Sequence, residues 1–499
     1  MSSALSGRSK VNHSPDMDAP RLCLLGSLEY DLKAYLSGHP MGYERVAVVM
    51  FRRYRSNTPG LLASDRFVAV EIQPFEESWF TGRSEMHFEF SLRYLRIFFQ
   101  RCEEEGLVFG LAHSHPSGNP DFSLQDDENE QTLLQAIANR NGRESHLVAL
   151  ILCDGNWYGR LRCGQTLKYA TTVRHIAVLG ERLDLHAVSI TVAPTSDDTW
   201  ARQAAAFGQP FVDKLQSLRV AVVGCSGTGS PAATLLARAG VGEIVLIDHD
   251  QLEVSNLNRV RGARKVDVGH NKAEIARNFI QSMGINVQAA AIDALVDVNP
   301  DAIDALMACD IVFGCTDDDL GRQALNAAVS FYGLAYIDLG LGGRIDTGSD
   351  GIPRMTHQHG RVSMVLPEYG ECLYCQQVTT DRDASRQQAI RDNPDITEDE
   401  LRERYLDGGR VQSPGVGPFT SAVADLGVAT LFDLIQPYRN LPGELRRDLI
   451  CIDLVRMTTF SMAQRKDVTC VYCGTREQKL RATPYRLGRP QLGRYTNNA

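Results

Sequence analysis

The chain contains 499 residues, of which 43% are hydrophobic, and it carries a formal net charge of −9. This length predicts two or three domains with substantial cores. The acidic balance argues against nucleic acid as the main partner, and no apolar run approaches the ~20 residues that span a bilayer. We therefore expect a cytoplasmic protein that binds neither nucleic acid nor a membrane.

Composition also suggests where the domains begin and end. The first residues are polar and typical of disorder, and the stretch VAPTSDDT is typical of a linker. We predict a disordered tail over 1–20, a first domain over 21–191, a linker over 192–199, a second domain over 200–480 and a surface tail over 481–499. Strand-like apolar runs alternate with helical patterns, so the expected fold class is α/β.

The first domain carries two histidines, a serine and an aspartate in the pattern H-x-H-x7-S-x2-D. The apolar segment before His113 predicts a buried strand, and alternate strand residues face the same way, so His113 and His115 can face one metal. The turn-rich PSGNPD leads to a helix capped by Ser123, and Asp126 in its first turn can reach back. Two imidazoles and one carboxylate form a zinc set with a fourth position open for water, which is typical of catalytic zinc.

This spacing resembles the JAMM (MPN-type) metalloprotease family, which includes deubiquitinases. The resemblance implies an α/β metalloprotease domain with a catalytic zinc on these three ligands and a glutamate that moves protons at the zinc-bound water. Glu44, just before an apolar run, stands where the family places this glutamate, and Glu71, inside a strand-like alternation, is its rival. Ser123 resembles the family serine that hydrogen-bonds the tetrahedral intermediate, and it can cap its helix as well.

The second domain opens with a strand, a glycine turn, a helix and another strand. Gly224, Gly227 and Gly229 follow the apolar VAVV, and glycines there let backbone N–H groups approach a phosphate at the start of a helix. The second strand ends at Asp248, where a carboxylate can bind a ribose hydroxyl. This pattern alone fits any dinucleotide enzyme, so an NAD-dependent oxidoreductase with an accessory metal domain stays open as a less favoured alternative.

The residues that follow favour ATP. Cations bind a triphosphate and a carboxylate holds magnesium, and the chain supplies Asn256, Arg259, Lys272 and Asp317 in that order. This run resembles the Rossmann-like adenylation domain shared by ubiquitin-activating enzymes, ThiF and MoeB. The resemblance implies that the first three contact the phosphates and that Asp317 holds magnesium. It also matches Arg202 to an arginine that reaches the partner's nucleotide in homodimeric members, which implies a homodimer through this domain.

Cysteines form a second candidate metal site. The chain has 12 cysteines, and we see no signal peptide, so free thiols rather than disulfides are expected. Two C-x-x-C pairs, Cys372–Cys375 and Cys470–Cys473, can form a closed, structural thiolate zinc site. The pairs lie farther apart than in a zinc ribbon, but the activating enzymes that this chain resembles share the arrangement.

The chain departs from activating enzymes that form thioesters, which carry a nucleophilic cysteine between the two pairs. No cysteine lies between Cys375 and Cys451. Ser413 is the hydroxyl nearest the family position, with Thr420 and Ser421 behind it. Either the acyl-adenylate is handed on directly, or a hydroxyl accepts the acyl group as an oxyester; Ser413 can also be a plain turn residue. The charged stretch before it is expected to form a helical flap.

The two domains are expected to act on one substrate. JAMM enzymes cleave after the C-terminal glycine of a ubiquitin-like protein, and activating enzymes adenylate that glycine. The resemblances imply a chain that processes and activates a ubiquitin-like protein, as in bacterial ubiquitin-like conjugation systems. They imply zinc, ATP and magnesium as cofactors and a conjugating enzyme as a further partner. Activation of a sulfur carrier for thiocarboxylate formation, and a non-catalytic scaffold, stay open as alternatives.

Overall fold

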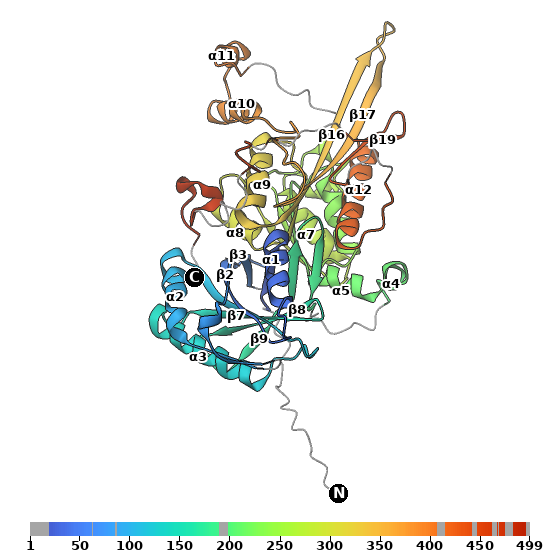
Figure 1. Ribbon diagram of the computed structural model, residues 1–499. Coiled ribbons are helices and arrows are strands. Elements are labelled where there is room, and N and C mark those ends of the chain that lie inside the picture. The colour runs from blue at the N-terminus through green and yellow to red at the C-terminus, as the bar shows by residue number, and fades with distance from the viewer. Residues whose placement is uncertain are drawn as a thin grey trace.

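The computed structural model contains two large sheets, one from each half of the chain (Figure 1). It describes residues 19–61, 63–84, 87–188, 198–406, 415–441, 447–461, 467, 469–474 and 483–495. The predicted tail over 1–20 and the predicted linker over 192–199 are each described only at their last two residues, and Ser413 lies outside the described residues.

The first sheet has nine strands in the order β11-β10-β1-β3-β2-β6-β7-β8-β9. They are β1 (Arg21–Leu25), β2 (Val46–Ser56), β3 (Ser64–Pro74), β6 (Val108–Ser114), β7 (His146–Cys153), β8 (Asn156–Cys163), β9 (Ala170–Thr172), β10 (His175–Leu179) and β11 (Leu183–His186). Strand β1 runs parallel to β10 and β3, and β6 runs parallel to β7. The remaining pairs are antiparallel, so the sheet is mixed.

Helices cover both faces of this sheet because its strands are apolar on both sides. They are α1 (Gly26–Ser37), α2 (Arg96–Glu105) and α3 (Leu124–Asn141), with a separate ribbon of β4 (Phe80–Arg83) and β5 (Phe88–Phe90). Leu32 of α1 packs with Leu22 on one face, and Leu133 of α3 packs with Val46 on the other. Alternate strand residues point to opposite faces, which explains the division.

The second sheet has eight strands in the order β14-β13-β12-β15-β16-β17-β18-β19. They are β12 (Arg219–Val223), β13 (Glu243–Ile247), β14 (Gln288–Ile292), β15 (Ile311–Gly314), β16 (Ala335–Thr347), β17 (Pro353–Val365), β18 (Leu449–Asp453) and β19 (Thr458–Phe460). The first five in spatial order are parallel and the last three join antiparallel. Short, nearly continuous apolar runs suit such doubly covered parallel strands, and the Rossmann-like α/β prediction for this half is confirmed.

Helices surround this second sheet. They are α4 (Ala201–Phe207), α5 (Gln209–Ser217), α6 (Gly229–Arg238), α7 (Lys272–Ser282), α8 (Pro300–Met307), α9 (Asp319–Tyr332), α10 (Asp381–Asp392), α11 (Glu398–Glu403) and α12 (Gly417–Ile435). Helices α10 and α11 lie within the charged stretch that was expected to form a flap. The β16–β17 hairpin projects beyond the body (Figure 1).

Helix α12 corrects one sequence expectation. It is 19 residues long and apolar enough, by length and composition, to cross a membrane, although no run of that kind was expected. In the structure 56% of the most apolar 18-residue stretch of this helix is buried. The helix packs on α6, β16 and β17. Buried core helices pass the same test, because a helix surrounded by protein needs apolar residues on most sides.

The two halves meet across a buried, charged interface. Arg21 of β1 lies 2.8 Å from the Asp310 carboxylate, and the Arg66 guanidinium donates to the carbonyl oxygens of Tyr332 and Gly333 at 2.7 and 2.6 Å. Asp310 stands just before β15, so the first sheet packs at the amino end of the second sheet's parallel strands. A single hydrophobic cluster extends through both halves.

The C-terminal segment differs from its prediction as a surface tail over 481–499. Leu487 and Leu492 are buried, and the Arg486 guanidinium binds the Asp304 carboxylate at 2.6 and 2.7 Å. The Tyr495 ring lies 5.7 Å from that of Tyr54 in the first half. Apolar and aromatic residues spaced between basic ones thus pack against both halves over the described part, residues 483–495.

Candidate functional site

The predicted zinc ligands lie together at the end of β6 and the start of α3. His113 Nε2 lies 2.9 Å from His115 Nε2 and 3.1 Å from an Asp126 carboxylate oxygen. The His115–Asp126 distance is 3.6 Å, and all three side chains are buried. His115 follows β6, where its backbone N–H donates to Leu152 of β7 at 2.9 Å. Strand pairing therefore places both imidazoles on the same face of the sheet, at the carboxyl ends of β6 and β7.

A capping box fixes Asp126. The Ser123 hydroxyl donates to its carboxylate at 2.7 Å, and the Asp126 N–H donates back to that hydroxyl at 3.1 Å. Burial alone would raise the pKa of Asp126, but hydrogen bonds from His113 and His115 hold it well below its usual range. The pKa of His115 is raised: burial opposes this, but Asp126 and the Asn119 carbonyl outweigh it. The cluster thus places the ionised Asp126 carboxylate beside the imidazole nitrogens of His113 and His115.

The geometry of this cluster fits a tetrahedral metal ion. With zinc–nitrogen and zinc–oxygen bonds of about 2.0–2.1 Å, ligand atoms on a tetrahedron stand about 3.3 Å apart. The three observed separations, 2.9, 3.1 and 3.6 Å, bracket that value. His115 Nδ1 lies 2.7 Å from the Asn119 carbonyl oxygen, an interaction that orients an imidazole for binding through its other nitrogen.

Glu44 is a buried carboxylate whose charge interacts with this cluster. It is 4% exposed, and burial raises its pKa to about 7, with His115 opposing the rise and Asp126 adding to it. A carboxylate with a pKa near neutrality suits proton transfer at neutral pH. The rival Glu71 instead accepts two hydrogen bonds from the Arg101 guanidinium, at 2.9 and 3.1 Å.

The glycine turn lies between β12 and α6. Gly224 has φ +87°, a left-handed conformation, and a Cβ there would stand 2.7 Å from the Cys315 carbonyl oxygen. A Cβ on Gly229 would overlap the carbonyl oxygen of Gly224. A Cβ on Gly227 would lie 3.1 Å from Arg259, so that arginine lies over the turn. The turn therefore requires glycine for close packing and ends at the amino terminus of a helix, where anions bind.

Asp248 and its neighbours lie beside the turn. Its carboxylate accepts the Cys225 N–H at 2.6 Å and the Asp250 N–H at 2.8 Å, and burial raises its pKa. Asn271, which caps α7, donates to the Asp248 carbonyl at 2.8 Å. Lys272 in the first turn of α7 pairs with Asp250 at 2.8 Å. Asn271 was not among the residues predicted from the sequence, although an asparagine before a helical pattern is a recognisable cap signal.

Of the other predicted nucleotide and magnesium ligands, Arg259 lies over this turn, and Asn256 and Asp317 lie in loops that follow β13 and β15. The Asn256 amide oxygen accepts the Glu253 N–H at 3.2 Å in a short turn after β13, and the Arg259 guanidinium donates to the Ser255 carbonyl at 3.1 Å. Asp317 is exposed in the loop between β15 and α9. These positions are compatible with a site that opens at the carboxyl ends of β12 and β15, where doubly wound folds bind ligands.

The start of α12 also borders this site, although Ser413 lies outside the described residues. A Cβ on Gly415 would stand 3.5 Å from Arg259. A Cβ on Gly227 would lie 3.1 Å from the Thr420 methyl group, and the Thr420 hydroxyl donates to the Gly417 carbonyl at 3.0 Å. The segment after the predicted acyl acceptor is therefore next to the glycine turn.

Arg202 lies away from the glycine turn of its own chain. It is exposed on α4, and α4 packs at the carboxyl end of α6, where Gln203 donates to the Ala239 carbonyl at 2.9 Å. The glycine turn stands at the opposite end of this helix, about 15 Å away for ten residues. The structure does not bring Arg202 to the other predicted nucleotide ligands within one chain.

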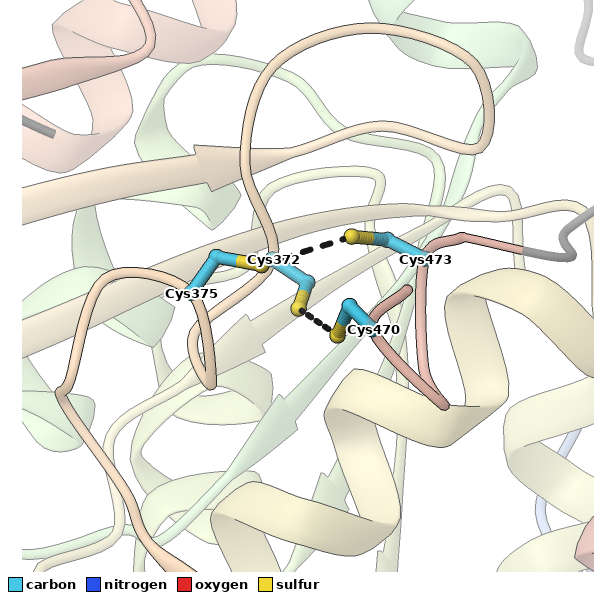
Figure 2. A group of neighbouring side chains, drawn as sticks. All are labelled: Cys372, Cys375, Cys470 and Cys473. Atoms are coloured by element: carbon cyan, nitrogen blue, oxygen red, sulfur yellow. Dashed lines mark hydrogen bonds between the residues drawn. The ribbon is translucent and has the colours of Figure 1, made fainter. Parts of the chain in front are cut away.

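The four cysteines of the two C-x-x-C pairs converge (Figure 2). The Cys372 and Cys470 sulfurs lie 3.7 Å apart, and the Cys375 and Cys473 sulfurs 3.6 Å apart. A disulfide needs about 2.05 Å, whereas thiolates on tetrahedral zinc stand about 3.8 Å apart, given zinc–sulfur bonds near 2.3 Å. The geometry therefore fits a four-thiolate metal site and not two disulfides.

Comparisons with known proteins concern mainly the second half. A family model described as the ThiF family matches residues 200–472. The SAMP-activating enzyme E1 of Haloferax volcanii is 36% identical over 124 residues, 25% of this chain and 46% of that enzyme. The sulfur carrier protein ThiS adenylyltransferase of Escherichia coli is 32% identical over 136 residues, 26% of this chain and 53% of that enzyme.

A solved structure gives a weaker likeness. The crystal structure of E. coli MccB with MccA-N7isoASN is 21% identical in sequence to this chain, with a TM-score of 0.42. The match covers 56% of this chain and 76% of the MccB chain. The chain spans about half, or less, of the length of the curated relatives it matches.

Proposed function

Because the match over residues 200–472 covers more than half of its length, this chain belongs to the ThiF family, and we propose that it adenylates the C-terminal carboxylate of a ubiquitin-like protein. The observation that carries the proposal is the glycine turn with cations and carboxylates around it. The names of the relatives, which act on SAMP and on the sulfur carrier ThiS, support a substrate of this kind. Family membership favours ATP over NAD at this turn.

In the proposed reaction the residues around the turn bind ATP and orient it. Backbone N–H groups at the start of α6 and the Arg259 guanidinium bind the phosphates, and the Asp248 carboxylate accepts a ribose hydroxyl. Lys272 leaves Asp250 and turns to the phosphates. Asp317 would hold magnesium, which would offset the charge of the phosphates. The substrate carboxylate then attacks the α-phosphorus, and pyrophosphate leaves.

Exchange of labelled pyrophosphate into ATP, dependent on the ubiquitin-like protein, tests this proposal. We expect Lys272→Ala and Asp317→Ala to lose most of the exchange, because each removes charge that offsets the phosphates. Asp346→Ala, on the exposed β16–β17 hairpin, is the matched control and should keep it. Exchange at the unmodified rate in both site variants would refute the assignment.

A second function is supported by the cluster around His113. We propose that the first half is a JAMM/MPN-type zinc peptidase that cleaves after the C-terminal glycine of the same protein. Zinc held by His113, His115 and Asp126 would lower the pKa of a water and polarise the scissile carbonyl. Glu44 would take a proton from the attacking water and pass it to the leaving amine. Ser123, which is exposed, is the nearby hydroxyl donor for the intermediate.

Cleavage of a ubiquitin-like protein fused to a short extension tests this half. His113→Ala should abolish cleavage and leave pyrophosphate exchange intact, because its ligand role lies outside the adenylation site. Cleavage that survives both this change and a chelator would refute the zinc assignment. Mass analysis of the processed and activated product distinguishes a thiocarboxylate, expected for a sulfur carrier, from a conjugate.

The remaining parts of the proposal concern partners. We propose that the protein acts in the cytoplasm, that the adenylation domain forms a homodimer in which Arg202 reaches the partner's nucleotide, and that a conjugating enzyme receives the activated protein. Its exposure and its distance from the turn of its own chain make Arg202 compatible with that role. Acyl transfer is proposed to go directly from the adenylate or through an oxyester at Ser413. An adduct stable to dithiothreitol and lost in Ser413→Ala would support the oxyester.

A further inference from the structure

Two arginines of β8 bind the helix that carries Asp126. The Arg160 guanidinium contacts the Glu130 carboxylate at 2.9 Å and the Asp127 carboxylate at 2.8 Å. Arg162 binds the same Glu130 at 2.7 Å and also contacts Asp127. The Arg162 and Glu130 side chains are each 3% exposed. Since buried carboxylates are costly unless they are paired and hydrogen-bonded, this network fixes the first two turns of α3 against β8.

Arg160 also reaches the other side of Asp126. Its guanidinium carbon lies 3.8 Å from the centre of the Phe122 ring, close enough for a cation–π contact. The Phe122 ring in turn lies 6.4 Å from the His113 ring. One side chain therefore contacts the residue before Ser123 and two carboxylates after Asp126, so it restrains the chain on both sides of the capping box.

We propose that Arg160 is a positioning residue for the zinc site, which rests on the peptidase function proposed above. Arg160 cannot itself bind the metal, because a guanidinium stays protonated and has no lone pair to offer. Instead it holds Phe122 and the first turn of α3, and so keeps the Asp126 carboxylate within 3.6 Å of both imidazoles. Arg162 carries the neutralising charge for the two carboxylates when Arg160 is removed.

The test is the affinity of the histidine site for zinc in Arg160→Met, measured on the full chain by competition with a chromogenic chelator after the four-cysteine site has been filled. Methionine keeps much of the stem, and Arg162 stays paired with Glu130 and Asp127, so the fold should persist. We expect a loss of zinc affinity of about tenfold, the lower end of the 10–100-fold range for groups bonded directly to a metal ligand, because Arg160 acts on Asp126 through its neighbours. Cleavage should fall at limiting zinc and recover at saturating zinc.

Arg53→Met is the matched control. Arg53 binds Asp65 at 3.0 and 2.8 Å in the same sheet, on the paired strands β2 and β3. It should lose a comparable ion pair without changing zinc affinity. Arg160→Lys retains charge but lacks the planar fork, and we expect an intermediate loss. Circular dichroism and the thermal unfolding midpoint report that each variant is folded.

The outcomes separate this inference from the proposed peptidase function. Zinc affinity in Arg160→Met within twofold of the unmodified chain, or an equal loss in Arg53→Met, would overturn the positioning role alone. Zinc binding in His113→Ala equal to the unmodified chain would overturn the zinc site itself, and the positioning role with it. A loss of about tenfold or more confined to the Arg160 variants, with cleavage restored by excess zinc, supports the inference.

Discussion

The two candidate metal clusters are built on opposite principles. His113, His115 and Asp126 come from one strand–turn–helix segment, whereas the two cysteine pairs are 98 residues apart and meet only in the folded chain. The first cluster has three ligands and a buried glutamate beside it; the second has four sulfurs with tetrahedral spacing. The difference teaches that local geometry prearranges the first site, whereas the second holds distant segments together. Metal should therefore matter for activity in one and for stability in the other.

The sharpest test of the first half is Glu44→Gln. The amide cannot take a proton, so we expect cleavage to fall about 10²–10⁴-fold, whereas zinc affinity stays unchanged. Glu71→Gln is the matched control, because it removes the carboxylate that pairs with Arg101. Normal turnover in Glu44→Gln, with loss in Glu71→Gln, would exchange the two roles.

Cys470→Ala tests the second cluster and should mainly affect stability. Loss of a structural metal belongs to the few changes that cost about 4 kcal/mol or more, so we expect a lower unfolding midpoint for the adenylation half. Cys451→Ala, a buried cysteine outside the cluster, should cost less. Equal effects of these two substitutions would contradict a metal-bound site.

Zinc uptake at the cysteines should release protons. Burial raises the pKa of the Cys375 thiol to about 12, and hydrogen bonding with Cys473 together with burial raises that of Cys372. The metal-free thiols are therefore protonated at neutral pH, and thiolate ligands must lose those protons. Zinc affinity should rise with pH, measured by competition with a chelator between pH 6 and 8. A pH-independent affinity would exclude thiolate ligation.

Ser123→Ala separates local order from catalysis in the first half. Loss of a helix cap costs about 0.5–2 kcal/mol, and Asp126 loses one hydrogen bond that holds its carboxylate. We expect a small drop in stability and weaker zinc binding. Thermal unfolding with and without zinc measures both effects. Ser78→Ala, an exposed serine before β4, should change neither.

Acid should loosen the first half before the second. Burial lowers the pKa of His146 to about 4, with Arg53 adding to the effect, against about 6.5 in an unfolded chain. Between these values the unfolded state binds more protons, so stability is present above pH 6.5 and is lost as the pH falls toward 4. Hydrogen exchange at pH 7 and 5 should show this around β7, and His146→Gln should reduce it. Unchanged exchange around β7 between the two pH values would contradict this.

Several features followed from sequence because they depend on a few adjacent residues. Strand alternation places His113 and His115 on one side, and a capping box brings Asp126 to them. The glycine turn likewise depends on local close packing, and the adenylation fold is confirmed by the family match over residues 200–472. For residues this close in sequence, the backbone geometry of a strand, turn or helix end largely fixes which side chains lie together.

Tertiary structure decided what distance in sequence concealed. Only the folded chain shows that the charge of Glu44 interacts with His115 and Asp126, that Glu71 pairs with Arg101, and that Arg160 of β8 contacts the helix of Asp126. The folded chain also shows that the basic C-terminal stretch packs against the body and that the apolar helix α12 is part of the core. These contacts join residues that no periodicity relates, because they depend on how whole sheets and helices pack.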